Sequence, residues 1–168
     1  MELWVLRFVH ISASVVWAGW SMFIGWYLLP ALAEAGPSGG AVMNSMLRRR
    51  LPAAMNVLAF VTMLTGFRLY SMFFSLTWLK TAPGMLLSIG LLLGLGGFVI
   101  GLAVSRPTSM RLAALGAIIR DQGAPPNAEQ ASALQALTAR SARAARLIAW
   151  HLAAATLIMA VSRYFPVG

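Results

Sequence analysis

Polar residues recur along one side of an otherwise apolar stretch near the N-terminus, residues 3–29. They stand three or four residues apart and are Arg7, His10, Ser14, Trp17 and Ser21. This spacing places them on one face of a single helix. The stretch is long enough to cross a bilayer, where an ionisable residue is costly and usually faces the interior of a bundle or a cavity. We therefore expect a polar seam inside the membrane, with His10 as its side chain suited to bind a metal.

Arg68 is a second ionisable residue within an apolar stretch. Counted from the helix ends at about 1.5 Å per residue, it lies at a depth similar to that of the histidine in the first span. The preceding Thr65-Gly66 offers a hydroxyl and a position for close approach. The only nearby acidic residue is Glu2, which is terminal, so a bound anion is an attractive partner for the arginine. Lys80 and Arg163 are further cations expected at the same edge of the membrane.

Heme b would satisfy these residues together. Its iron suits His10, its two propionates suit Arg68, Lys80 or Arg163, and its macrocycle suits the aromatic and glycine faces nearby. The alternative is that His10 only hydrogen-bonds a neighbouring helix while Arg68 extends toward the membrane surface. The residues by themselves leave both interpretations open.

Two more side chains of the first span belong to the expected heme pocket. Ser14, one turn from the histidine on the same face, would orient the imidazole or line the pocket. Trp17 would contribute an aromatic wall.

His151 is the only other histidine, and we also consider it as an iron ligand. It is expected about one turn into the fourth span from the cytoplasmic side, roughly 12–17 Å from the depth of His10. Three possibilities follow: the two helices are offset and share a heme, His151 serves a second site, or it is structural.

The composition is typical of a polytopic membrane protein. Of the 168 residues, 60% are hydrophobic and 10% are charged, which fits one all-α integral membrane bundle with a single domain over residues 1–168. The absence of cysteine excludes disulfides, thiolate metal sites and iron–sulfur clusters. The net charge of +9 comes mainly from arginines between apolar stretches, so we do not expect nucleic-acid binding.

Four spans are predicted, and Pro30 is expected to close the first. Their approximate bounds are 3–29, 52–76, 84–105 and 147–165. Residues 31–51 are expected to form a loop because they contain the breaker cluster Gly36-Pro37-Ser38-Gly39-Gly40. The third span carries Gly90, Gly94, Gly97 and Gly101 on one face, which indicates close helix packing or a flat surface for a planar cofactor.

A cytoplasmic loop is predicted over residues 106–146, with a short surface helix over 108–120. Asn127 is a plausible N-cap, and Glu129 complements the helix dipole. From Ala128 a helical extension should continue directly into the fourth span. The arginine-rich loops should be cytoplasmic, which leaves both termini outside, and we expect the bacterial inner membrane as the location.

Short motifs in all four spans resemble a superfamily of small heme b membrane proteins. It includes the copper-resistance D family, the membrane protoporphyrinogen oxidases and the membrane domain of bacterial urate oxidases. The similar segments are Arg7-Phe8-Val9-His10, Val16-Trp17-Ala18-Gly19, Thr65-Gly66, Trp78-Leu79-Lys80 and Met159-Ala160-Val161-Ser162-Arg163-Tyr164. The resemblance implies a small helical bundle in which His10 binds heme b, and it maps a lysine after the second span to Lys80. The further polar motifs of the protoporphyrinogen oxidases are absent from the sequence, so that activity is not carried over.

Three functions remain open at this point. The first is a heme b membrane redox protein that carries electrons, alone or as a subunit of a redox complex. The second is copper handling with His10 and methionine ligands, and the third is an accessory subunit without a cofactor. The expected partners are membrane lipid, a quinone or redox protein, and either further copies of the chain or other subunits.

Overall fold

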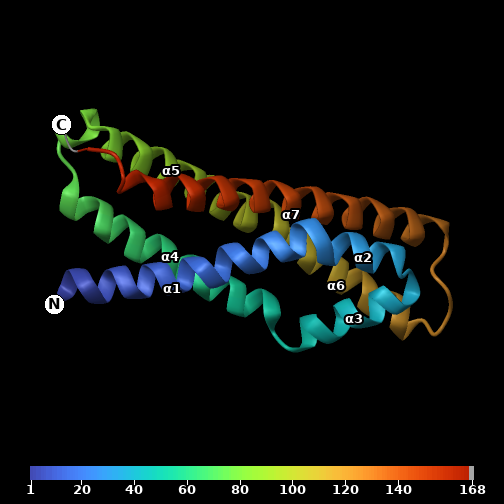
Figure 1. The fold of residues 1–168 in the computed structure, drawn as a ribbon. Helices are drawn as coiled ribbons and strands as arrows, with labels where there is room; N and C mark the ends of the chain where they lie inside the picture. The colour runs from blue at the N-terminus through green and yellow to red at the C-terminus, as the bar shows by residue number, and fades with distance from the viewer. Residues whose placement is uncertain (167–168) are drawn as a thin grey trace.

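The chain folds into an elongated all-α bundle with four long helices (Figure 1). The structure is a computed structural model that describes residues 1–166. The four helices are long and apolar enough to cross a membrane, and they are Glu2–Glu34, Leu51–Phe73, Ala82–Asp121 and Ala128–Ser162. This confirms the predicted four-helix bundle of a multi-pass membrane protein.

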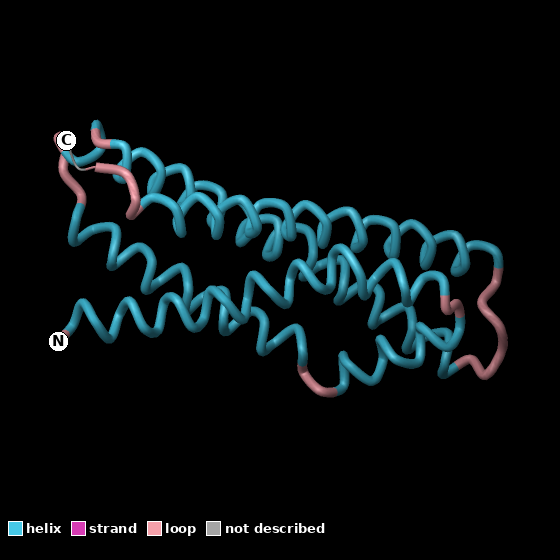
Figure 2. The backbone as a smooth tube through the Cα atoms, in the orientation of Figure 1, coloured by secondary structure: helices cyan, strands magenta, loops and turns pink. Residues whose placement is uncertain are grey.

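The bundle consists of two antiparallel helix pairs (Figure 2). Helix α1 (Glu2–Phe23) packs on α4 (Leu51–Phe73), and α5 (Ala82–Ile100) packs on α7 (Ala128–Ser162). The two pairs meet mainly through α1 and α7, whereas α4 and α5 have little contact with each other. We call the end where the chain starts and finishes the terminal end, and the other end the arginine-rich end.

The first helix was expected to end at Pro30, but it continues through this proline. After α1 the chain forms a π-helical turn, η1 (Ile24–Leu28), and then continues as α2 (Leu29–Glu34). A proline in a helix lacks an N–H and clashes with the carbonyl four residues earlier. The π-turn changes the hydrogen-bond pairing just before Pro30, which allows the helix to pass through it.

The third helix passes a proline in the same way. The π-turn η3 (Gly101–Ser105) follows α5 and leads into α6 (Arg106–Asp121), which contains Pro107. The short surface helix expected over 108–120 is therefore the end of one continuous helix. It lies against α7 beyond the predicted span.

The region expected to be a loop contains helix α3 (Pro37–Arg48). Gly36 has a φ of +58°, a left-handed conformation that ends α2. Proline then suits the first turn of the next helix. Arg50, with a φ of +57°, provides the break before α4. The glycine and proline cluster thus separates two helices.

The predicted start of the last helix is confirmed at Asn127. Its side-chain oxygen accepts from the Gln130 backbone N–H at 2.8 Å, and the Gln130 side chain accepts from the Asn127 N–H at 3.0 Å. This is a complete capping box. From it α7 runs as one helix of 35 residues along the bundle.

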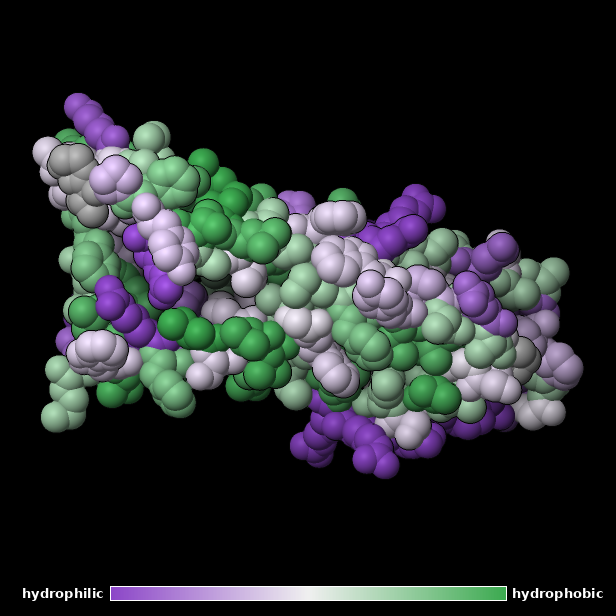
Figure 3. Space-filling model, in the orientation of Figure 1, coloured by the Kyte–Doolittle hydropathy of each residue, from purple (hydrophilic) through white to green (hydrophobic). Residues whose placement is uncertain are grey.

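The buried core is small and lies where α1, α4 and α7 meet. Trp17, Ala18, Ala59 and Leu152 form it. The predicted glycine face packs on α7 only in part: a Cβ atom at Gly90 would lie 2.6 Å from Met159 and one at Gly97 would lie 3.2 Å from Leu152. At Gly94 and Gly101 a Cβ atom would meet no close neighbour. Many large apolar side chains point outward (Figure 3), as expected for helices that face lipid.

Candidate functional site

His10 lies on α1 and directs its imidazole at α4. Its Nδ1 is 3.0 Å from the Thr62 carbonyl oxygen and 3.3 Å from the Thr65 hydroxyl. A carbonyl oxygen can only accept, so Nδ1 carries the proton and donates. In a neutral imidazole the other nitrogen, Nε2, then keeps its lone pair. The histidine is thus oriented by a neighbouring helix and retains one nitrogen able to bind a metal.

Gly66 provides the space for the His10 ring. A Cβ atom at this position would lie 2.8 Å from Cε1 and 3.3 Å from Nδ1 of His10. Any other residue would therefore push the ring away from α4. The close-approach glycine noted beside Thr65 in the sequence has this role.

Two threonines of α4 complete the surroundings of the imidazole. The Thr65 hydroxyl donates to the Val61 carbonyl at 2.6 Å, which leaves its oxygen free to accept from His10. The Thr62 hydroxyl is buried and has no hydrogen-bond partner among the described residues. A buried polar atom without a partner is uncommon in a native protein. Thr62 carries no recognisable signal in the sequence, because a threonine in an apolar span has many structural uses.

Ser14 and Trp17 do not contact the imidazole through hydrogen bonds. The Ser14 hydroxyl donates to the backbone carbonyl of His10 on the same helix, so it does not orient the ring. Trp17 is buried against Ala59 and Leu152. It lies seven residues beyond His10, or about 10 Å along the helix.

Arg68 pairs with Glu2, the one nearby acidic residue, whereas the sequence favoured a bound anion as its partner because Glu2 is terminal. Its Nη2 and Nε atoms lie 2.7 and 3.0 Å from the same carboxylate oxygen of Glu2. The first turn of α1 lies beside the end of α4, which brings the terminal glutamate within reach. The side chains of Arg68 and Glu2 are 53% and 58% exposed, so this pair remains accessible at the surface of the bundle.

The remaining predicted cations also lie near the terminal end. Lys80 is exposed in the short 3-10 helix η2 (Trp78–Lys80), which joins α4 to α5. The guanidinium of Arg163 lies 4.8 Å from the centre of the Tyr164 ring and donates to its hydroxyl at 2.8 Å. No hydrogen bond within residues 1–166 joins either cation to His10.

His151 lies in the other helix pair, against α5. Its Nδ1 is 2.8 Å from the Leu147 carbonyl of its own helix, so its Nε2 also keeps a lone pair. A Cβ atom at Gly96 would lie 2.9 Å from Cδ2 and 3.2 Å from Nε2 of this ring. Both histidines therefore pack on a glycine of a neighbouring helix.

The structure does not bring His10 and His151 together. Leu152, the residue after His151, packs with Trp17, so His151 is near the level of Trp17 and about 10 Å below His10. The two histidines thus lie at different depths, but the difference is smaller than the roughly 12–17 Å expected from the sequence. Within residues 1–166, no three His, Asp or Glu side chains gather into a metal cluster.

The fit to heme differs between the predicted residues. His10 fits an iron ligand, because its Nδ1 faces the Thr62 carbonyl and must donate, which leaves the lone pair on Nε2. The buried Thr62 hydroxyl nearby has no hydrogen-bond partner among the described residues. Figure 3 shows the molecule hollowed at the terminal end, between the two helix pairs, with hydrophilic side chains in the hollow. Arg68 fits a propionate only if it shares or leaves Glu2.

Comparison of the chain with protein-family models, curated proteins and solved structures finds no match.

Proposed function

We propose that this protein binds heme b within the membrane through His10 and serves in electron transfer. The observation that carries the proposal is the 3.0 Å contact between His10 Nδ1 and the Thr62 carbonyl oxygen of α4. Because the carbonyl can only accept, this contact requires Nδ1 to donate and leaves the lone pair of a neutral imidazole on Nε2. Histidine ligands of metals commonly donate their other N–H to a carbonyl or carboxylate, which sets the ring orientation and raises the basicity of the ligand. A bound heme would supply one-electron chemistry.

The residues around His10 have separate roles in this proposal. The Thr62 carbonyl and the Thr65 hydroxyl oxygen accept the hydrogen bond from His10 Nδ1. Gly66 allows the ring to lie close to the backbone of α4. Because these three residues belong to another helix, the ligand orientation depends on the α1–α4 interface.

Arg68 is proposed to hold a propionate at the terminal end. Exchange of Glu2 for a propionate would replace one carboxylate by another and keep a charge-assisted hydrogen bond. Because the existing pair is more than half exposed on both sides, its loss is expected to cost little, in the range of about 0–1 kcal/mol for surface pairs. Lys80 and Arg163 are proposed as additional cations for the propionates, as in the sequence analysis.

His151 could ligate the same iron as His10 only if the helices shifted. The two histidines contact different helices at different levels, so we propose His10 alone as the histidine ligand of this heme. His151 is then structural or serves a second site. We also propose a quinone or a redox protein as the electron partner, and a bacterial inner membrane with the arginine-rich end in the cytoplasm.

The visible spectrum of protein purified with ample heme supply tests the proposal. A Soret band, with split α and β bands on reduction, is the expected result. The His10→Ala variant should lose the heme or retain only a weakly held form. A colourless wild-type protein without iron would exclude the heme hypothesis, and copper in the same elemental analysis would favour the copper-handling alternative.

The His151→Ala variant separates the two roles of the second histidine. We expect an unchanged spectrum and unchanged heme content, because His151 does not share a site with His10. Loss of the low-spin spectrum would instead show that both histidines ligate one iron.

A further inference from the structure

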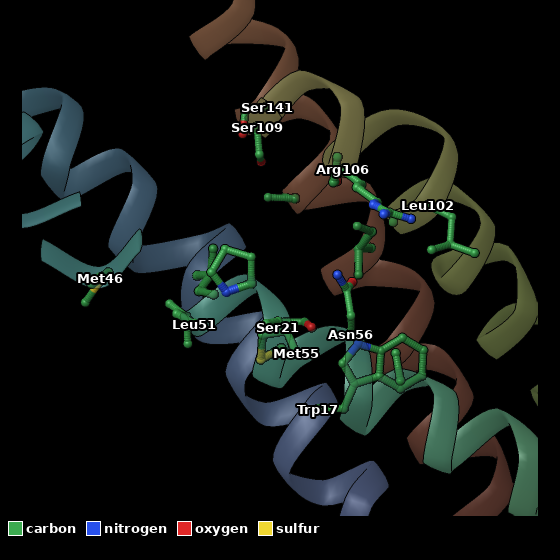
Figure 4. A pocket seen from close by; sticks show the side chains of 18 of the residues that line it. Trp17, Ser21, Met46, Leu51, Met55, Asn56, Leu102, Arg106, Ser109 and Ser141 are labelled. Atoms are coloured by element: carbon green, nitrogen blue, oxygen red, sulfur yellow. The ribbon is translucent and has the colours of Figure 1, made fainter. Parts of the chain in front are cut away.

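A cavity of about 550 Å³ lies toward the arginine-rich end, away from His10 (Figure 4). Residues of α1, α4, α5, α6 and α7 line it, including Trp17, Ala59 and Phe98. Since α4 and α5 have little contact with each other but both line the cavity, it occupies the space that separates them. The two π-turns, at Ile24–Leu28 and Gly101–Ser105, also contribute to its wall.

The polar side chains of the wall can donate hydrogen bonds but have no side-chain hydrogen-bond partner among the described residues. They are Ser21, Asn56, Ser105, Arg106, Ser109 and Ser141. None of them takes part in the side-chain hydrogen bonds or ion pairs of the described residues, which are otherwise numerous in this chain. Asn56 and Arg106 come from different helices, α4 and α6, and both line the cavity (Figure 4).

The charge of the cavity wall is positive. Arg106 is its only charged residue among the described lining, and no Asp or Glu lines the cavity. An adjoining crevice shares Met46 and Leu51 with it and adds Arg49. Arg49 also forms no ion pair with a described residue. Arg106 in the cavity and Arg49 in the adjoining crevice thus have no carboxylate partner among the described residues.

The rest of the wall is apolar and adaptable. It includes Met43, Met46, Met55 and Met110, whose flexible side chains can fit irregular apolar groups. A ligand for this space therefore combines an apolar body with a head group that accepts hydrogen bonds from arginine, asparagine and serine.

We propose that the cavity binds one anionic phospholipid, with its phosphate at Arg106 and its acyl chains along the apolar wall. A negatively charged head group is favoured over a neutral quinone, because Arg106 and Arg49 carry positive charge and form no ion pair with a carboxylate of the described residues. Hydrogen bonds to an ionised acceptor are roughly twice as strong as neutral ones. Basic pockets between helices at the cytoplasmic side of a membrane suit such head groups, and the arginines place this end there.

Native mass spectrometry of the full chain, with added phosphatidylglycerol or phosphatidylcholine, tests the proposal. One phosphatidylglycerol should be retained in preference to phosphatidylcholine. Arg106→Gln should lower the retained fraction about tenfold, as expected for loss of a charge-assisted hydrogen bond. Arg111→Gln is the matched control, because Arg111 is on the same helix and exposed but does not line the cavity.

A second variant fills the cavity without removing a charge. Gly101 lines the cavity and has no atom within 4 Å of a Cβ placed on it, so Gly101→Leu should fold and exclude the lipid. Gly116→Leu is its control, since Gly116 is equally open and lies outside the cavity.

Equal losses of lipid in Arg106→Gln and Arg111→Gln, or lipid retention by Gly101→Leu, would overturn the proposal. The proposal would also be overturned if a short-chain quinone displaced phosphatidylglycerol and bound the Arg106→Gln variant as tightly as the wild type.

Discussion

At the scale of single residues, the two histidines differ in what holds them. The His151 ring is bonded to a carbonyl four residues earlier in its own helix, whereas His10 is bonded to a helix 52 residues away in sequence. The orientation of His10 therefore reports on the α1–α4 interface. That of His151 follows from its own helix and would persist if neighbouring helices moved.

The contact between Gly66 and His10 gives the first prediction. Gly66→Ala would place a methyl group 2.8 Å from Cε1 of His10, so the ring must move and its bond to Thr62 should weaken. We expect altered heme absorption and lower heme content in the visible spectrum. Gly94→Ala is the control, because its Cβ would meet Met63 at 3.7 Å, an ordinary contact. An unchanged spectrum for Gly66→Ala would contradict the proposed ligand geometry.

The pair of Arg68 and Glu2 gives the second prediction. If Arg68 turns from Glu2 to a propionate, Arg68→Ala should weaken heme binding, whereas Glu2→Gln should leave it unchanged or tighten it. Heme titration of the two variants measures the difference. If both variants weaken binding equally, the ion pair has a structural role and Arg68 is not a propionate ligand.

At the scale of helices, prolines and glycines decide where helices bend and meet. Pro30 and Pro107 each follow a π-turn and leave their helices continuous. Gly25 lies within the first of these turns and is buried. Its backbone contacts α7 at Ala145, so the turn also sets how closely α1 and α7 approach.

Gly25 gives the third prediction. A Cβ there would lie 2.6 Å from the Ala145 carbonyl oxygen, and a backbone atom cannot move aside as a flexible side chain can. Gly25→Ala should destabilise the protein by about 1–3 kcal/mol, the usual cost of overpacking. The midpoint of thermal unfolding in detergent should fall accordingly.

Gly19→Ala is the control for this change, since Gly19 is on the same helix and a Cβ there meets nothing within 4 Å. Its unfolding midpoint should stay the same or rise, because alanine favours a helix over glycine by up to about 1 kcal/mol. A midpoint for Gly25→Ala equal to that of Gly19→Ala would show that α1 and α7 are farther apart.

At the scale of the whole molecule, charge separates the two ends of the bundle. Nine of the 13 lysine and arginine residues lie at or beyond the inner ends of the predicted spans: Arg48, Arg49, Arg50, Arg106, Arg111, Arg120, Arg140, Arg143 and Arg146. The terminal end holds the other four, and Arg68 there is paired with Glu2. This asymmetry predicts that the arginine-rich end is cytoplasmic.

Labelling of single cysteines checks this orientation, since the native chain has none. Ser45→Cys and Ser132→Cys should react with an impermeant reagent only after the membrane is opened. Leu76→Cys, which is exposed between α4 and η2 at the terminal end, should react in intact cells. The reverse pattern would overturn the topology and the cytoplasmic location of the phospholipid cavity.

The sequence by itself determined the fold class, the number of long helices and the start of the last helix. These follow from local chemistry: apolar length sets a membrane helix, and the side chains of Asn127 and Gln130 cap their own helix. It also indicated that His10 and His151 lie at different depths, because helical rise converts residue number into height.

Only the tertiary structure decided which groups meet across helices. Thr62 as the acceptor for His10, Glu2 as the partner of Arg68, and the gathering of Asn56 and Arg106 around one cavity all join positions far apart in sequence. The tertiary structure also decided that the helices continue through Pro30 and Pro107. Each π-turn lies where its helix lines the cavity or packs on α7. Packing between helices, which no local pattern encodes, selects among the rotations that each helix could adopt on its own.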